Sequence, residues 1–303
     1  MADARAVRSL RDRVLLLRST PAFGALDDES LTLFAEHGRT ASFRAGETLL
    51  REGRPVDAVH LVIEGQVTSM RRGKRVAVVR AMRGVGFLSL MARDDHGVDA
   101  TADVDTTTLA IPAEAVQDAL EESFPLVRNA LRNSAGGLVD RRQKLPVDPD
   151  NPPPLVEAPM PTEPRTLAEH VLGTRGGGIF ARSNLEAVVA VARSVEEVRF
   201  AAGTELWNLG DASTAWYRIE SGRVRCTSPE GRSVDVGHRF VVGMMDALAA
   251  RPRAFAARAE TPLLVYRQDL EPFLAILEAH FELARELLAV LARANLATPE
   301  REP

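Results

Sequence analysis

The stretch FAAGTELWNLGDASTAWYRIESGRV, Phe200 to Val224, organises the chain, because a second version of it occurs earlier. That version is FRAGETLLREGRPVDAVHLVIEGQV, Phe43 to Val67, and the two align without a gap at a shift of 157 positions. Three of the identical pairs are glycines, which favour turns that need a positive φ. A repeat of this length indicates a duplicated domain rather than a solenoid unit. The identical pairs are Phe43/Phe200, Ala45/Ala202, Gly46/Gly203, Leu49/Leu206, Gly53/Gly210, Ala58/Ala215, Gly65/Gly222 and Val67/Val224.

Each copy has the pattern of a small β domain with helices on either side. From Thr40 to Ile111, short alternating strands are separated by turn residues, which predicts a β-barrel or sandwich. After Pro112 the apolar residues follow helical spacing. The second copy repeats this order, with a barrel over about 195–266 and two closing helices. The sequence therefore predicts a mainly β protein with flanking α-helices.

The repeated motif resembles a known family. F-x-A-G, a glycine-bounded turn and a hydrophobic strand ending in S/E-G-x-V are similar to the cyclic-nucleotide-binding domain family. That family includes the bacterial catabolite activator proteins and the regulatory subunits of the cAMP-dependent kinase. The resemblance covers about residues 23–134 and 179–294. It implies two jelly-roll β-barrels of cyclic-nucleotide-binding type, each with N-terminal and C-terminal helices.

Four segments follow from this pattern. We expect an N-terminal helix in residues 1–22, a first domain in 23–144, a linker in 145–165 and a second domain in 166–303. The linker, LPVDPDNPPPLVEAPMPTEPR, is so rich in proline that neither a helix nor a central strand can form. It is interpreted as a semi-extended spacer. The alternative is a polyproline II ligand for an SH3-like module.

Composition narrows the class of protein. The net charge of −4 gives no general attraction to nucleic acid or to an anionic membrane. The single cysteine, Cys226, excludes an intramolecular disulfide and a cysteine-based metal cluster. No apolar run approaches the ~20 residues that cross a bilayer, and no secretory signal is recognisable. We therefore expect a cytoplasmic protein, and the strong preference for arginine over lysine suggests a bacterial source.

The resemblance also implies where a ligand would bind. In the family a cassette similar to F-G-E-L-A-L, a short loop and P-R-x-A-T holds the nucleotide. Its glycine approaches the phosphate, its glutamate accepts from the ribose 2′-hydroxyl, and its arginine pairs with the phosphate. In the second copy, Gly243 keeps the glycine, Met244 replaces the glutamate, and Arg253 keeps the arginine and is followed by Ala254.

Two interpretations of Arg253 remain open at this point. It is either a phosphate ligand or a surface loop arginine in an arginine-rich chain. Asp246, two residues past Met244, could offer the missing carboxylate.

The first copy departs further from the family cassette. In FLSLMARDDHGVDATADV, residues 87–104, we place Leu88 at the glycine and Ser89 at the glutamate. Val98 then takes the arginine position, and Thr101 alone keeps the family type. The resemblance therefore implies a degenerate first pocket that does not bind a cyclic nucleotide in the family manner.

No other motif indicates chemistry. The histidines lack metal-ligand spacing, and no nucleophile elbow, Walker or dinucleotide motif occurs, so we expect no enzyme, metal or cofactor. Only ATPEREP follows the last predicted helix, so we expect no helix-turn-helix domain and no DNA binding. The predicted function is a non-enzymatic regulatory or adaptor protein that acts through a protein partner or self-association. The alternative is a second-messenger sensor that binds a cyclic nucleotide only in the second domain, through Arg253.

Overall fold

The computed structural model describes residues 9–20, 23–24, 26–93, 97–142, 144–175, 178–180 and 183–298. The chain divides into two compact units. The first runs to Asn133 and resumes at Leu288, and the second is Ser134–Leu287. The predicted boundaries at residues 22, 144 and 165 stay predictions, and the predicted linker falls within the second unit. The first part of the predicted N-terminal helix lies outside the described residues.

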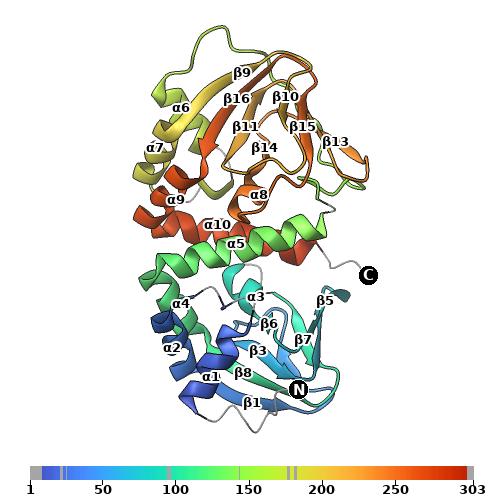
Figure 1. Ribbon diagram of the computed structural model, residues 1–303, viewed down its shortest axis with the longest axis vertical. Coiled ribbons are helices and arrows are strands. Elements are labelled where there is room, and N and C mark those ends of the chain that lie inside the picture. The colour runs from blue at the N-terminus through green and yellow to red at the C-terminus, as the bar shows by residue number, and fades with distance from the viewer. Residues whose placement is uncertain are drawn as a thin grey trace. The chain divides into compact units, whose positions relative to one another are not determined.

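The first unit contains two four-stranded antiparallel sheets, ordered β1-β8-β3-β6 and β2-β7-β4-β5. Helices α1, α2 and α4 gather on one side of these strands, beside β1 and β8 (Figure 1). Its elements are α1 (Leu10–Arg18), α2 (Asp28–His37), β1 (Arg39–Phe43), β2 (Thr48–Leu50), β3 (Ala58–Glu64), β4 (Gln66–Arg71), β5 (Lys74–Arg80), β6 (Gly84–Val85), α3 (Phe87–Met91), β7 (Asp99–Ala102), β8 (Thr106–Pro112), α4 (Ala113–Glu122) and α5 (Phe124–Arg141), the last of which crosses into the second unit.

The second unit repeats this plan with the sheets β14-β11-β16-β9 and β10-β15-β12-β13, again antiparallel. Helices α6 and α7 lie beside β9 (Figure 1). Its elements are α6 (Leu167–Arg175), the 3₁₀ turn η2 (Gly178–Phe180), α7 (Leu185–Ser194), β9 (Val195–Phe200), β10 (Glu205–Trp207), β11 (Ala215–Ser221), β12 (Val224–Thr227), β13 (Ser233–Val236), β14 (Val241–Val242), α8 (Met244–Leu248), β15 (Ala256–Ala259), β16 (Leu263–Asp269), α9 (Leu270–Ala279) and α10 (Phe281–Ala297), whose later part belongs to the first unit.

The shift of 157 positions holds well beyond the quoted repeat. Helices α3 and α8, strands β7 and β15, and strands β8 and β16 all begin 157 residues apart. The repeated glycines have the expected backbone, since Gly65 and Gly222 have φ values of 101° and 91°. A Cβ on Gly222 would lie 2.3 Å from the carbonyl oxygen of Pro262, so this turn admits only glycine. The predicted fold class, two antiparallel β domains with flanking helices, is confirmed.

The interior of the second barrel is unusually aromatic for a chain with 5% aromatic residues. Trp207 stacks on Tyr217 with ring centroids 5.7 Å apart, and it meets Phe255 edge-on at the same separation. Leu145, from the proline-rich segment, is buried in the same cluster. The barrel interior is therefore filled partly by a residue that the sequence assigns to a spacer.

The proline-rich segment has no helix or strand, but it is not a free spacer. The carbonyl oxygen of Val156 accepts from the backbone N–H of His238 at 2.8 Å. The carbonyl of Ala158 accepts from Ser221 Oγ at 2.7 Å, and Arg165 pairs with buried Glu220. The segment thus packs along the second barrel, because Leu145 is buried in the barrel interior and the carbonyls of Val156 and Ala158 accept hydrogen bonds from barrel residues.

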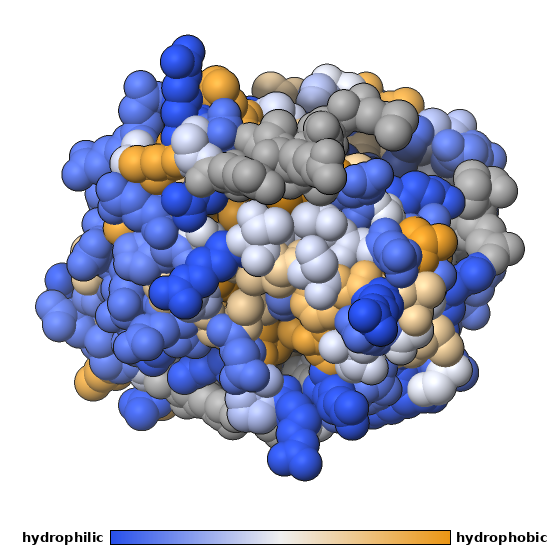
Figure 2. Space-filling view, turned by 90° about the horizontal axis from the view of Figure 1, so that it is seen from below, coloured by the Kyte–Doolittle hydropathy of each residue, from blue (hydrophilic) through white to orange (hydrophobic). Residues whose placement is uncertain are grey.

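The described surface is dominated by polar residues. The face in Figure 2 is mostly hydrophilic around its edges, with apolar residues gathered near its middle. Within the described residues, every helix is too short or too polar to span a bilayer.

Candidate functional site

The candidate site of the second unit begins at the turn that precedes α8. Gly243 is the N-cap of this helix and has a φ of 86°, a conformation that glycine adopts without strain. The loop after α8 returns beside the loop that follows β10, where the backbone N–H of Arg253 donates to the carbonyl of Asp211 at 2.8 Å. The backbone N–H of Gly210 in turn donates to the carbonyl of Arg253 at 2.9 Å. These bonds fix the backbone from which the Arg253 side chain starts.

The guanidinium of Arg253 points into the protein. Its Nη1 donates to the carbonyl of Gly243 at 2.9 Å, and its Nη2 donates to the carbonyl of Ala215 on β11. Its Cζ lies 4.1 Å from the ring centroid of Trp207, a cation–π geometry. The side chain is buried, and burial lowers its pKa, an effect opposed by the carboxyl of Asp246. Arg253 therefore joins α8, β11 and the aromatic core.

Gly243 makes room for this guanidinium. A Cβ at position 243 would lie 2.4 Å from Arg253 Nη1 and 3.0 Å from the Trp207 ring. In the family, the glycine at this position lets the backbone approach the phosphate. In this chain, its lack of a side chain makes room for the guanidinium of Arg253.

The structure bears on one of the two interpretations of Arg253 made from the sequence. The surface arginine is wrong, because the side chain is 5% exposed. The phosphate-ligand interpretation stays a prediction: each Nη makes one hydrogen bond and one ring face is engaged, whereas Nε has no hydrogen-bond partner among the described residues. Of its predicted neighbours, Met244 and Ala254 are partly buried.

Asp246 is the second ionisable group of this site. It is 1% exposed, and its Oδ2 has no hydrogen-bond partner among the described residues. Burial raises the pKa of Asp246 to about 6, despite opposing effects from the Ala254 backbone N–H and from Arg253. A buried carboxyl with a free oxygen costs stability when it ionises, and such groups gather at functional sites.

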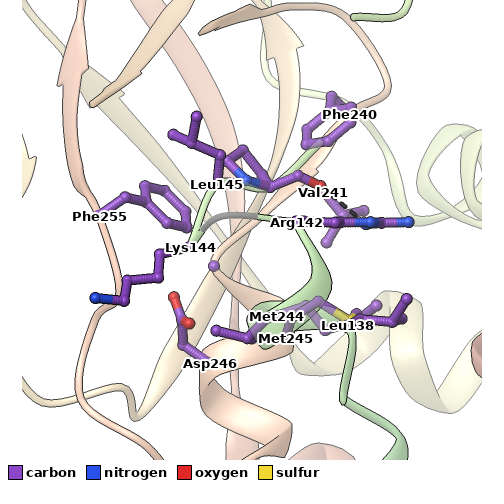
Figure 3. Close-up of a pocket in the computed structure, with 13 residues that line it drawn as sticks. Leu138, Arg142, Lys144, Leu145, Phe240, Val241, Met244, Met245, Asp246 and Phe255 are labelled. Carbon is purple, nitrogen blue, oxygen red and sulfur yellow. Dashed lines mark hydrogen bonds between the residues drawn. The ribbon is translucent and has the colours of Figure 1, made fainter. Parts of the chain in front are cut away.

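A small cavity lies between α8 and the start of the proline-rich segment. Its volume is about 80 Å³. In Figure 3, Leu145 lies above it between Phe255 and Phe240, Met244 and Met245 lie below, and the carboxyl of Asp246 points toward it. A water takes roughly 30 Å³ of liquid, and drug-sized ligands need roughly 300 Å³ or more. The cavity admits a few waters and excludes a nucleotide.

The cassette of the first unit differs in register from the sequence prediction. The N-cap of α3 is Gly86, with a φ of 101°, and it is 157 residues before Gly243. The family glycine is therefore Gly86 and not Leu88. By the same shift, the position of Arg253 is taken by His96, outside the described residues, and not by Val98. The ungapped repeat places the cassette glycine two residues before the position that the motif letters suggest.

The residues singled out in the first cassette have structural roles. Ser89 is buried on α3, and a Cβ on Gly97 would lie 2.3 Å from Ser89 Cβ, so loop and helix are in tight contact. Val98 is buried, Leu88 is partly buried, and Thr101 pairs with Thr48 and Thr68 in the sheet. This packing leaves the loop close against the cassette helix.

His60 gives the first barrel a pH dependence. It is buried on β3, its Nδ1 lies 3.0 Å from Thr108 Oγ1, and burial lowers its pKa to about 4. Between pH 4 and 6.5 the unfolded chain binds more protons than the folded one. Stability of the first unit is therefore expected to fall by about 3 kcal/mol as the pH drops through this window.

The change His60→Gln should abolish this dependence, because glutamine can still bond to Thr108 without a charge. The measurement is urea unfolding followed by far-ultraviolet circular dichroism at pH 4.5 and 7.5. Both tryptophans lie in the second unit, so their emission separates its transition from that of the first. An unchanged pH dependence in the variant would show that His60 is not its source.

Two members of the site were missed by sequence reasoning. Trp207, which provides the ring under Arg253, has no signal for this role in the sequence around it. Leu145 was assigned to the linker. A leucine next to Pro146 at the end of a helix gives no signal for burial in a barrel forty or more residues away. Among the described residues, no cluster of three or more acidic, histidine or cysteine side chains could hold a metal ion.

Comparison with known proteins identifies the family. The family model for the cyclic nucleotide-binding domain matches residues 40–123 and 197–280, more than half of the chain. No curated protein matches.

Similar solved structures include regulatory subunits and regulators. A regulatory subunit of a cAMP-independent protein kinase A from Trypanosoma cruzi, bound to guanosine, is 13% identical, with 89% of this chain and 85% of that one covered and a TM-score of 0.34. The regulatory domain of Toxoplasma gondii protein kinase A with cAMP is 15% identical, with coverages of 94% and 96% and a TM-score of 0.36. The N-terminal domain of a transcriptional regulator from Streptomyces coelicolor is 27% identical, with coverages of 40% and 90% and a TM-score of 0.36.

The same domain model matches both halves of the internal repeat, so both halves are assigned to one family. The chain belongs to the cyclic nucleotide-binding domain family, with two tandem copies of its regulatory domain.

Proposed function

We propose that the chain is a non-enzymatic regulatory protein that acts through protein–protein contacts, with neither barrel binding a cyclic nucleotide in the folded state described. The observation that carries the proposal is the inward guanidinium of Arg253. To reach a phosphate it would have to leave the carbonyls of Gly243 and Ala215. Each lost hydrogen bond to the charged guanidinium costs about 1.5–3 kcal/mol, which a ligand would have to offset.

The first barrel supports the same proposal. Its cassette keeps Gly86 but has Phe87 at the glutamate position and His96 at the arginine position. Asp99 and its acidic neighbours in the loop add negative charge. A cyclic phosphate there would lack the cassette arginine, and a loop rich in aspartate disfavours an anion.

The domains of this family are regulatory rather than catalytic, which supports the proposal that the chain is not an enzyme. When a regulatory domain has no ligand, its output must depend on a surface that another protein reads. A protein partner or a second copy of the chain fills this role in our proposal, and DNA does not, given the net charge of −4.

A second candidate function follows from one specific feature. Gly243 and Arg253 are both of the family type and lie in direct contact, with 2.9 Å between the carbonyl oxygen and Nη1. If Arg253 turned outward, Gly243, Met244 and Ala254 would surround its guanidinium as a phosphate site. In that case the chain would be a second-messenger sensor with one working domain.

A thermal-shift screen separates the two candidates. With cAMP, cGMP and cyclic dinucleotides at millimolar concentration, we expect no saturable increase in Tm, because neither barrel binds them in the proposed function. A ligand that did bind would be detected, since at 100 times its Kd it would add about 2.7 kcal/mol of stability. A saturable increase would instead support the sensor and reject the ligand-independent function.

The interaction itself is tested by affinity capture from the native source. We expect a specific partner, or a second copy of the chain, to be retained at physiological salt. Failure to recover either would contradict the adaptor function. Binding to DNA that weakens steeply with salt would point instead to a DNA-binding regulator.

A further inference from the structure

The two units differ at one sheet edge. In each unit one sheet ends in the second strand of a hairpin, which is β5 in the first unit and β13 in the second (Figure 1). The two strands are equivalent, because Val67 pairs with Val79 and, 157 residues later, Val224 pairs with Val236. The same position in the fold can therefore be compared between the two units.

In the second unit, a segment of the chain itself lies beside this edge. Residues 149–156 line two hollows together with β13 and the turn after it. The backbone N–H of His238 donates to the carbonyl of Val156 at 2.8 Å, and a Cβ on Gly237 would lie 3.0 Å from Leu155 Cδ1. An extended stretch without helix or strand thus occupies the edge of the second barrel.

The same segment is acidic where it meets the barrel. Asp150 pairs with Arg232, directly before β13, and Glu157 lies 3.9 Å from Arg223, directly before β12. Carboxylates of an extended segment and arginines of the hairpin therefore lie side by side at this edge.

The equivalent edge of the first unit has no such cover. Among the described residues, β5 pairs only with β4, and the backbone groups of residues 76–79 that point away from β4 have no hydrogen-bond partner. The carbonyl of Gln66 accepts from the N–H of Asp103 at 2.9 Å, on the side of β7. Bonding directions alternate along a strand, so Thr68 also bonds toward β7. Val78, opposite Thr68, therefore directs its N–H and carbonyl outward.

The hairpin that ends in β5 is strongly basic. Residues 66–83 include six basic residues and no acidic one, in a protein of net charge −4. Lys74, Arg75 and Arg80 are exposed on β5. Arg75 is 157 residues before Arg232, the arginine that pairs with the acidic segment in the second unit. These like charges oppose pairing of two β5 edges from two copies and favour an acidic strand.

We propose that the edge of β5 is a docking site for an extended acidic segment of a partner protein, which pairs with β5 as an added strand. Such a strand would bond to the outward N–H and carbonyl of Val78 and bring its carboxylates to Lys74 and Arg80. The segment beside β13 supplies the precedent for an extended acidic occupant. The proposal rests on the proposed function and names the surface and the kind of partner that it requires.

The test titrates the full chain into the labelled peptide acetyl-ETVEVTE-amide at physiological salt, followed by fluorescence anisotropy. We expect saturable binding that the double change Lys74→Glu and Arg80→Glu weakens at least about tenfold, because like charges then meet. Arg39→Glu is the matched control, since Arg39 is exposed on β1, another edge strand of the same unit, and should leave binding unchanged.

A second comparison separates strand pairing from charge alone. In the peptide acetyl-ETPEPTE-amide every carboxylate is kept, but two N–H donors are lost and the chain cannot pair as a strand. We expect it not to bind the wild type. Val78→Pro should likewise abolish binding of the first peptide, because it removes the outward N–H of β5. Circular dichroism and urea unfolding establish that each variant is folded.

Four results would overturn the proposal: no saturable binding, equal binding of both peptides, equal weakening by Arg39→Glu, or tighter binding of duplex DNA than of the peptide. A wild-type dimer that Val78→Pro dissociates would assign the edge to a second copy and also overturn it. If the variants do not fold, the two peptides on the wild type decide alone. Binding of cAMP would contradict the proposed function without changing the peptide comparison.

Discussion

Replacing Arg253 by alanine is expected to destabilise the second unit by about 3–5 kcal/mol, as expected when one partner of a buried, charged network is removed. The change removes the guanidinium donors from the carbonyls of Gly243 and Ala215 and the cation from the face of Trp207. It also leaves Asp246 without its nearest opposing charge inside the barrel. A residue that the family uses for a ligand would in this chain be part of the fold.

Urea unfolding followed by tryptophan emission measures this effect, because Trp207 and Trp216 report on the second unit alone. Arg251→Ala is the matched control. Arg251 lies two residues away, is exposed, and pairs with Asp140 at 2.7 Å, an interaction worth about 0–1 kcal/mol. If Arg253→Ala were no more destabilising than Arg251→Ala, the buried role assigned to Arg253 would be wrong.

The change Asp246→Asn is expected to stabilise the second unit at pH 8. The pKa of Asp246 is about 6 in the folded chain and 3.8 in the reference state. Between these values the folded state binds more protons than the unfolded one, so stability falls as the pH rises from about 4 to 6. Above pH 6 the ionised carboxyl costs about 3 kcal/mol, which the neutral amide does not.

The measurement is again urea unfolding by tryptophan emission, at pH 4 and at pH 8. We expect nearly equal stability of wild type and Asp246→Asn at the lower pH and a more stable variant at the higher. Asp140→Asn serves as the control, since Asp140 is an exposed partner of Arg251. A variant that is less stable than the wild type at pH 8 would mean that the ionised carboxyl has a partner that the structure does not reveal.

The fold could be predicted from the sequence because the sequence contains the same domain motif twice. Gly46 and Gly203 recur with the same positive φ of 84°, and strands such as β7 and β12 alternate in burial. Local turn chemistry and periodic apolar residues determine such features, so they can be recognised before any tertiary contact is known.

The first cassette shows how motif matching fails. Leu88 was placed at the glycine position because the letters F-L-S-L resemble F-G-E-L. In the structure the helix begins after Gly86, whose positive φ no leucine would adopt readily. The physical requirement of the turn, rather than the similarity of letters, identifies the equivalent residue.

The second cassette and the proline-rich segment depended on contacts between distant parts of the chain. The inward path of Arg253 requires Trp207, which lies 46 residues earlier, and the carbonyl of Ala215. The burial of Leu145 requires the interior of a barrel that begins fifty residues later. Neither composition nor spacing near these residues carries that information.

The most direct test is a crystal of the full chain soaked in cAMP. We predict no nucleotide density beside Gly243, with both Nη atoms of Arg253 still bonded to the carbonyls of Gly243 and Ala215. A cyclic phosphate beside Gly243, with Arg253 turned outward to meet it, would contradict the account.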